Sequence, residues 1–455
     1  MNRTFFFFVI VILLLLVHRG SAADWKAGVA KVNITPQESQ WLAGYAGRNH
    51  ASEGILMDLW AKALILEDAE GKRSVLVTAD LLDFQKQMSD SIKKQLNDKL
   101  GLSPAQIILN ASHTHSGPVV LQSALVDMYL FDEQEKKKIE RYSRLLEQQI
   151  VDVVIKASQS MEPVTLAAGN GIARIQVNRR NNAEGKLTST TELRGPHDCA
   201  VPVLKVANAS GQIKALAFGY ACHPTVLDIY LWSGDYPGFA QAELEKWYPG
   251  AVALFFQGAG ADQNPLPRRT IPLAKQYGVT LAAAVDRTIQ EEMKVLPATL
   301  KTAYKEVALP LGTPYSEAHL TGIINNGPAF LQRYAQRFLD QIKKGEPLMQ
   351  SYPYPVQAWN IGGWTLFALG GELPIGYALQ LKQKYGENIF VLGFSNDVMG
   401  YIPTTTILQE GGYEGDTSQL EYGLPGKWSP TAESAIYEAI DGLAEQAGIL
   451  PRDQR

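Results

Sequence analysis

The sequence is poor in cysteine and close to neutral in charge, and both deficits exclude classes of protein. Cys199 and Cys222 are the only two cysteines in 455 residues, so the chain is not a small scaffold built on a disulfide framework. The sequence is consistent with a Cys199–Cys222 pair or with two buried thiols. The formal net charge is -4, which leaves no polybasic field and argues against a nucleic-acid partner.

Long apolar runs are also missing, apart from one at the start of the chain. A basic start precedes an unbroken apolar run from Phe5 to Val17, and the small residues Ser21–Ala23 follow. This order is typical of a signal peptide, which we predict over residues 1–23. The run is short for a mature membrane span, and no later stretch is long and apolar enough to be one. We therefore expect a secreted or periplasmic protein without a stable membrane span.

The rest of the sequence has no internal repeat and no low-complexity linker. Strand-like segments alternate with segments of helical period, as in "RSVLVTADLLDF" (73–84) followed by "QMSDSIKKQLNDKLG" (87–101). The alternation predicts an α/β fold, with mixed β-sheets flanked by helices, in one large domain over residues 24–455. Several predicted strands end in loops that carry Gly, Asn or His. We expect the active site at these carboxyl ends of the strands.

Histidine is scarce, but three of the seven histidines follow apolar strands. His113 and His115 lie in "NASHTHSGP" (110–118), and His223 lies in "ACHPT" (221–225). Residues two apart in an extended segment project to the same side, so His113 and His115 can face one cavity. Taken alone, the pair is equally consistent with two ordinary loop histidines.

A carboxylate occupies a comparable position later in the chain. Glu372, in "GGELPIG" (370–376), follows an apolar strand and precedes a predicted helix. Its charge can complement the positive end of that helix, or it can complete a His, His, Glu metal set. Imidazole and carboxylate together suit zinc. From these residues alone, both interpretations stay open.

A series of motifs in order resembles the neutral, non-lysosomal ceramidase family, and the match extends over most of residues 26–430. The motifs are "GVAKVNITP", "LAGYAGR", "NASHTHSGP", "ACHPT", "SGDYPG", "FFQGAGADQNP", "GGELP" and "NDVMGYIPT". The resemblance implies a zinc-dependent amidase. By this resemblance, the zinc ligands are expected to be His113, His223, Glu372 and Tyr401.

The same resemblance implies roles for residues beside the metal. His115 matches a histidine near the ion but not bound to it, and we interpret it as the general base. Arg179 and Tyr413 match polar groups that face the scissile carbonyl, with Arg180 and Arg174 as alternatives to Arg179. A metal-activated water is the implied nucleophile.

Two features depart from the family pattern. The family loop "GDVSP" carries a serine once assigned as the nucleophile, whereas this chain has "ADQNP", with Asn264 at the serine position. An amide cannot attack a carbonyl, so an acyl-serine route is excluded there, and Asn264 can donate a hydrogen bond instead. Longer members of the family add a C-terminal immunoglobulin-like domain, which we do not expect in this chain.

The sequence therefore predicts a secreted zinc-dependent amidohydrolase that cleaves the N-acyl amide bond of ceramide or a related N-acylated lipid. Two alternatives stay open: a hydrolase of the same fold that acts on a soluble amide or another bond, and a catalytically silent binding protein. Asp235 and Asp80 are candidates for orienting a metal-bound histidine, and each is equally consistent with an ordinary turn residue. No oligomeric state follows from the sequence.

Overall fold

The structure is a computed structural model that describes residues 25–121 and 128–454. The predicted signal peptide, residues 1–23, lies outside the described residues. Within the described part of the chain, no helix combines the length and the apolar character needed to cross a membrane.

The larger of two main sheets has nine strands. They are β1 (Trp25–Asn33), β3 (Trp60–Glu67), β4 (Arg73–Ala79), β5 (Ile107–Ala111), β6 (Glu162–Ile172), β8 (Ala200–Asn208), β9 (Ile213–Tyr220), β11 (Val252–Gln257) and β13 (Lys294–Val295). Their order is β11-β9-β8-β6-β1-β3-β4-β5, with β13 beside β6. The pairing is antiparallel except at the two edges, where β4 pairs with β5 and β9 with β11 in parallel.

The two edge strands of this sheet, β5 and β11, lie together at their carboxyl ends, although the series of pairings between them would make them antiparallel. Every pairing between β9 and β4 is antiparallel. At the carboxyl ends of β5 and β11, however, the Gln257 backbone N–H donates to Asn110 Oδ1 at 2.8 Å. A twist of roughly 20–25° per strand accumulates along such a sheet and brings its edge strands towards a common direction. The carboxyl ends of β5 and β11 therefore lie together.

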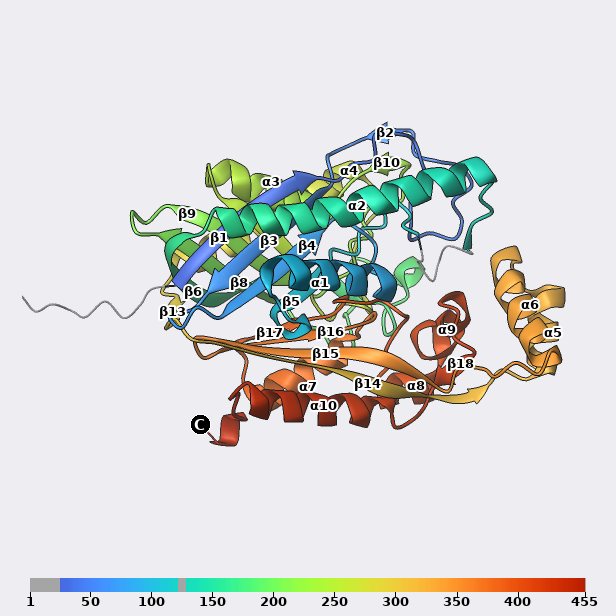
Figure 1. Cartoon of the computed structure of the whole chain (residues 1–455). Helices are drawn as coiled ribbons and strands as arrows, with labels where there is room; N and C mark the ends of the chain where they lie inside the picture. The colour runs from blue at the N-terminus through green and yellow to red at the C-terminus, as the bar shows by residue number, and fades with distance from the viewer. Residues whose placement is uncertain (1–24, 122–127, 455) are drawn as a thin grey trace, which may run out of the picture.

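A second sheet of five strands packs face to face on the first (Figure 1). Its strands are β14 (Leu300–Pro314), β15 (Ser351–Ile361), β16 (Trp364–Leu369), β17 (Ile389–Leu392) and β18 (Gly426–Trp428), in the order β17-β16-β15-β14-β18. Trp359, Trp364 and Phe390 of this sheet share a buried cluster with Leu254 and Phe256 of β11. Two short ribbons complete the strands: β2 (Gly54–Ile55) with β10 (Leu231–Trp232), and β7 (Gln176–Asn178) with β12 (Gln263–Pro265).

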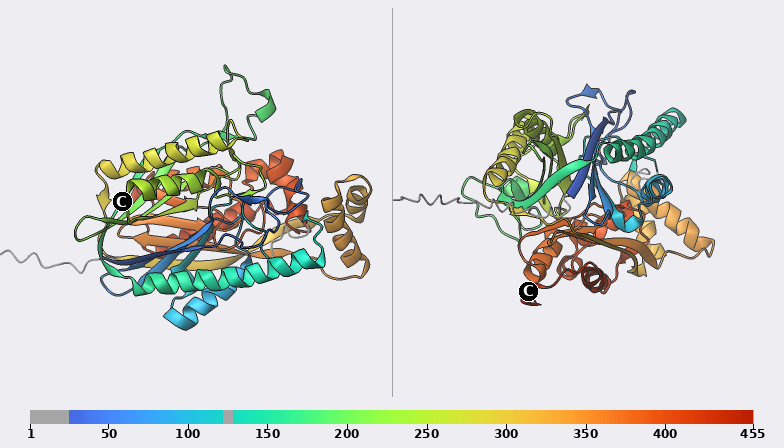
Figure 2. Two further views of the ribbon diagram at one scale, coloured as in Figure 1. Left: turned by 90° about the horizontal axis from the view of Figure 1, so that it is seen from above. Right: turned by 60° about the vertical axis from the view of Figure 1, so that its left-hand side comes forward.

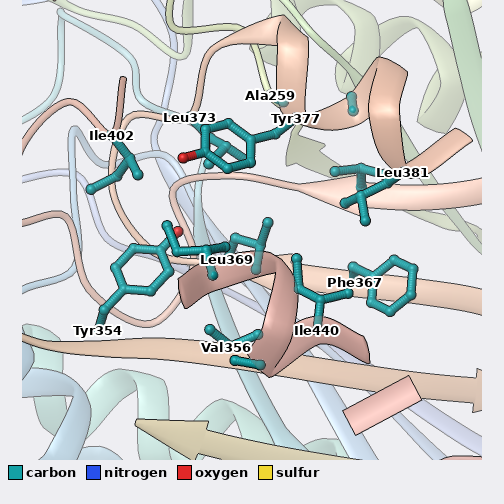
Figure 3. Packing of buried hydrophobic residues seen from close by; sticks show 14 of the residues in the cluster. Ala259, Tyr354, Val356, Phe367, Leu369, Leu373, Tyr377, Leu381, Ile402 and Ile440 are labelled. Atoms are coloured by element: carbon teal, nitrogen blue, oxygen red, sulfur yellow. The ribbon is translucent and has the colours of Figure 1, made fainter. Parts of the chain in front are cut away.

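Helices cover the outer faces of both sheets, which gives four layers (Figure 2). The helices on the nine-stranded sheet are α1 (Lys86–Leu100), α2 (Glu133–Gln159), α3 (Asp235–Trp247) and α4 (Ile271–Gln290). The five-stranded sheet is covered by α7 (Ile375–Tyr385) and α10 (Ala432–Gln446). Figure 3 shows this outer core, in which Tyr377 and Leu381 of α7 and Ile440 of α10 gather with Val356 and Phe367 of the sheet.

The remaining elements are a helical hairpin and several short turns. The hairpin of α5 (Glu317–Asn326) and α6 (Ala329–Lys343) connects β14 to β15 and projects at one end of the molecule (Figure 1). The short elements are η1 (Pro104–Gln106), η3 (Glu184–Lys186), α8 (Thr405–Glu410), the π-helical turn η4 (Tyr413–Thr417), α9 (Ser418–Glu421) and η5 (Arg452–Gln454). Among these, α9 packs against α6.

The predicted α/β class and the helix-flanked mixed sheets are confirmed. The strand predicted at 73–84 forms as β4 but ends at Ala79, and the helix predicted at 87–101 forms as α1. No strand was predicted for β14, in which charged and half-exposed residues interrupt the apolar pattern. Cys199 and Cys222 are free thiols in the structure, so the interpretation as a disulfide pair is wrong there.

Candidate functional site

His113 lies two residues beyond β5 and turns its imidazole into the protein interior. Its backbone is left-handed, with φ of 62°, and the residue is 1% exposed. Nδ1 lies 2.8 Å from the Leu82 carbonyl oxygen. A carbonyl can only accept, so Nδ1 carries the ring proton. The neutral ring therefore presents the lone pair of Nε2 to the site.

His223 reaches the same site from β9, near the other edge of the sheet. It lies three residues beyond the strand, and it is also 1% exposed. Its Nδ1 is 2.9 Å from the Gly260 carbonyl oxygen, so this ring too carries its proton on Nδ1 when neutral. The two histidines are thus oriented by backbone carbonyls of two different loops.

Glu372 comes from the second sheet and faces both imidazoles. It follows Gly371, whose φ is 72° and where a Cβ would lie 2.8 Å from the Gly400 carbonyl oxygen, so the turn requires glycine. One Glu372 carboxylate oxygen, Oε2, is 3.1 Å from His223 Nε2 and 3.5 Å from His113 Nε2. Three elements distant in the sequence therefore converge on one point.

When both rings are neutral, with their hydrogens on Nδ1, the atoms that face one another at this point are all hydrogen-bond acceptors. The Nε2 lone pairs of His113 and His223 meet a carboxylate oxygen, an arrangement that is repulsive unless a cation lies among them. Burial lowers the pKa of His113 to about 4, against the opposing effect of Glu372. Burial disfavours the ionised form of Glu372, but His113 and His223 outweigh it and hold the pKa of this carboxyl at about 2. Zinc binds imidazole nitrogens and ionised carboxylate oxygens, so these residues fit a metal ion.

His115 lies beside these donors, on the side of the "LAGYAGR" loop. Its Nε2 is 3.3 Å from His113 Nε2, and the ligand atoms of His113, His115 and His223 all lie within 4.8 Å of one another. Gly44 fits against the ring, because a Cβ there would lie 2.5 Å from His115 Nδ1. The Tyr45 ring also packs on it, with 4.7 Å between centroids. His115 is close enough to act as a ligand or as a base beside an ion.

Tyr401 and Arg179 lie next to Glu372. The Tyr401 hydroxyl accepts a hydrogen bond from Arg179 Nη2 at 3.1 Å, and Arg179 Nε donates to Glu414 Oε1 at 2.7 Å. Arg180 instead pairs with Glu410 at 2.8 Å and with Glu414 at 2.6 Å. The structure thus brings Arg179 to Tyr401, whereas Arg180 is held by the loop that contains Glu410 and Glu414.

Tyr413 packs against this group, and Asn264 lies on the short strand β12, paired with the strand that precedes Arg179. The Tyr413 ring is 5.2 Å from the Tyr401 ring between centroids, is 42% exposed, and its hydroxyl donates to Glu421 Oε2 at 3.2 Å. Asn264 lies on β12, opposite Val177, and is 6% exposed. Its Oδ1 is buried without a hydrogen-bond partner among the described residues.

Asp235 and Asp80 do not orient the histidines, so that hypothesis is wrong and the turn interpretation holds. Asp235 accepts from the backbone N–H of Leu227 at 2.8 Å, and Asp80 accepts from that of Trp60 at 2.9 Å. The Nδ1 atoms that a carboxylate would have to bind already meet backbone carbonyls. Both aspartates instead fix the chain next to the site.

Three side chains at the site were not found from the sequence: Glu414, Glu421 and Tyr422. Glu414 holds Arg179, Glu421 accepts from Tyr413, and the Tyr422 hydroxyl donates to Glu372 Oε1. All three lie in the short turns between α8 and β18, where apolar periodicity gives no signal. The only indication in the sequence is the grouping of acidic and aromatic residues in "YEGDTSQLEY".

The comparison with known proteins gives the family. A family model described as neutral/alkaline non-lysosomal ceramidase, N-terminal, matches residues 25–265. Neutral ceramidase of Pseudomonas aeruginosa is 26% identical over 265 residues, which is 54% of this chain and 38% of that protein. Neutral ceramidase B of Dictyostelium discoideum is 26% identical over 268 residues, or 54% of this chain and 36% of that protein. The matched part of this chain thus spans less than two fifths of the length of these relatives.

Solved structures show the same fold over more of the chain. The crystal structure of neutral ceramidase from Pseudomonas aeruginosa has a TM-score of 0.72 at 20% identity, and the match covers 94% of this chain and 75% of that one. A ceramidase complexed with C2 gives a TM-score of 0.73 at 20% identity, with 94% and 76% covered. Because the family model covers more than half of the sequence, the chain belongs to the neutral/alkaline non-lysosomal ceramidase family.

Proposed function

We propose that this protein is a secreted, zinc-dependent amidohydrolase that cleaves the N-acyl amide bond of ceramide or a related N-acylated lipid. Membership of the ceramidase family supports hydrolysis of such an amide. One observation carries the assignment to this site: Nε2 of His113 and Nε2 of His223 converge on the Glu372 carboxylate, with both Nδ1 atoms bound to backbone carbonyls.

In this proposal His113, His223, Glu372 and Tyr401 would hold zinc, which would supply a polarised water of lowered pKa. His115 Nε2 would accept a proton from the attacking water and return it to the nitrogen of the leaving amine. Its position 3.3 Å from His113 Nε2 supports this role.

Arg179 and Tyr413 stabilise the negative charge that develops on the carbonyl oxygen. Arg179 commits Nη2 to Tyr401 and Nε to Glu414, which fixes the guanidinium and leaves Nη1 for the substrate. Donors fixed in advance need no reorganisation when the charge forms, which is why they lower the barrier. Asn264 stands where a serine nucleophile would be, so water is the nucleophile and Asn264 contributes a hydrogen bond.

The test is a panel of N-acyl substrates given to zinc-loaded protein. It includes a ceramide with a labelled acyl chain, other N-acylated lipids, and soluble N-acyl amides such as N-acylated amino sugars. We expect about one zinc per chain and release of labelled fatty acid from ceramide. Turnover of soluble amides alone would contradict the lipid substrate, and zinc well below one per chain would favour a silent binding protein. Secretion is tested separately by the N-terminal sequence of protein recovered outside the cytoplasm.

A further inference from the structure

The Tyr413 hydroxyl has one hydrogen, and its contact with Glu421 decides where that hydrogen can go. The hydroxyl oxygen lies 3.2 Å from Glu421 Oε2, within hydrogen-bond distance. If Glu421 is ionised, its carboxylate can only accept, so the Tyr413 hydroxyl must donate to it. Tyr413 then has no hydrogen to donate to the carbonyl oxygen of a bound amide. The role proposed for Tyr413 therefore depends on the protonation of Glu421.

The surroundings of Glu421 disfavour its ionised form. Glu421 ends α9 and is 9% exposed. Within residues 25–121 and 128–454, no lysine or arginine forms an ion pair with it. The charged group that acts on it from the metal site is the like-charged Glu372.

Of the neighbouring arginines, Arg179 pairs with another acid and Arg337 stacks over the Tyr334 and Phe338 rings. Arg179, which lies 5.8 Å from the Tyr413 ring centroid, is held by Glu414. On α6, which packs against α9, Arg337 approaches the chain at Gly423. Burial raises the pKa of Glu421 to about 7, with the Glu372 charge acting in the same direction and the Tyr413 hydrogen bond against it.

Reversing the hydrogen bond removes the conflict. A neutral carboxylic acid has its own hydrogen to donate. If the acid donates to the Tyr413 oxygen, the phenol keeps its hydrogen for a third partner. If the carboxylate were ionised while Tyr413 turned to the substrate, two oxygens without a hydrogen between them would face each other at 3.2 Å.

We infer that Glu421 is a neutral acid that donates a hydrogen bond to the Tyr413 hydroxyl oxygen, so that Tyr413 donates its own hydrogen to the carbonyl oxygen of the bound amide. The inference rests on the proposed function. Glu421 acts through Tyr413 and is a positioning residue. No net proton is transferred in this step, because both hydrogens stay on their own oxygens.

The first test compares the pH dependence of kcat/KM for variants of zinc-loaded protein. For the wild type, this part of the activity is present at low pH and is lost as the pH rises through the pKa of Glu421, which burial raises above its usual value. Glu421→Gln keeps a donor to Tyr413 at every pH. It should retain the low-pH wild-type rate within about threefold and lose this decline. Glu421→Ala should lower the rate on the order of tenfold or more, approaching the 10²–10³ loss of one oxyanion donor.

Two controls separate this role from a structural one. Glu438→Gln removes the same charge from an exposed position on α10 and should leave the wild-type profile unchanged. In a Tyr413→Phe background, Glu421→Gln and Glu421→Ala should have the same rate, because the effect passes through the phenol. Equal losses in Glu421→Gln and Glu421→Ala with Tyr413 present, or a pH profile that Glu421→Gln leaves unchanged, would overturn the inference.

A second readout does not depend on turnover. Infrared difference spectra of zinc-loaded wild type against Glu421→Gln should show a carboxylic-acid C=O band that is present at pH 5 to 6 and disappears as the pH rises through the raised pKa of Glu421. If the band is already absent at pH 5 to 6, Glu421 is ionised and the inference is wrong. If the wild type hydrolyses no N-acyl substrate, the proposed function fails, and the infrared band still decides the protonation of Glu421.

Discussion

The two halves of the site are held by different kinds of contact. The histidines come from the region that the family model matches, residues 25–265, and backbone carbonyls of Leu82 and Gly260 orient them. Glu372 and Tyr401 come from beyond that region. Side chains orient them: Tyr422 donates to Glu372, and Arg179 donates to Tyr401.

This difference separates what the fold sets from what individual side chains set. A backbone carbonyl is present whatever residue occupies its position, so the histidine half keeps its orientation as long as the loops keep their path. The carboxylate half depends on particular hydroxyl and guanidinium groups. Single substitutions of orienting residues should therefore affect the carboxylate half and spare the histidine half.

The largest effect should follow from removing a ligand in the histidine half. His223→Ala deletes an imidazole donor, so zinc content should fall from about one per chain to near zero and turnover should fall below detection. Metal analysis after gel filtration and fatty-acid release measure the two quantities. The control His319→Ala changes an exposed histidine on α5 and should affect neither. Full zinc content in His223→Ala would count against the site.

The next effect is on turnover without loss of metal. Arg179→Ala removes the guanidinium beside Tyr401, and kcat should fall on the order of 10²–10³. Zinc content should stay near one per chain, because arginine is not a ligand. Arg180→Ala is the matched control, since the Arg180 side chain pairs with the 410–414 loop, and its loss should be roughly tenfold or less. Equal losses in both variants would remove the distinction between these neighbours.

A smaller effect tests the comparison of the two halves directly. Tyr422→Phe removes the hydroxyl that orients Glu372, and zinc affinity should weaken about 10–100-fold, as for other groups that orient a ligand. Leu82→Met changes the side chain but keeps the carbonyl that orients His113, so zinc affinity should stay within about threefold. Competition with a chelator of known affinity measures both variants. If Leu82→Met weakens binding as much as Tyr422→Phe does, the two halves do not differ in the way described.

The smallest effect is expected at the position where the family has serine. Asn264→Ala removes one hydrogen-bonding group, so kcat should fall by about tenfold or less and zinc content should not change. Steady-state rates with a saturating N-acyl substrate measure the change. Complete loss of turnover in Asn264→Ala would show that Asn264 has a role that water cannot replace.

The sequence predicted the histidine half better than the carboxylate half, for a physical reason. His113, His223 and Glu372 each follow an apolar strand closely, so local pattern and strand direction marked them as candidates, and the family resemblance then implied that they are zinc ligands. Tyr401 lies nine residues beyond β17, and it was identified only from the family resemblance. Glu414, Glu421 and Tyr422 reach the site because a segment of short turns folds back on it, and no local periodicity encodes such a return.

The convergence of the strand ends was expected, but its cause in the fold was not. Alternation of helices and strands predicted the class, yet the pairing order that separates β5 from β11 is a property of long-range contacts. The twist that accumulates along the nine-stranded sheet then brings Asn110 and Gln257 together. Neither the strand order nor the accumulated twist of the sheet can be predicted from a local stretch of sequence.

The most direct measurement is anomalous diffraction at the zinc edge from crystals of the zinc-loaded protein. The account predicts one strong peak about 2.0–2.2 Å from His113 Nε2, His223 Nε2 and a Glu372 carboxylate oxygen. A peak that is bound elsewhere, or no peak in protein that carries about one zinc per chain in solution, would contradict it.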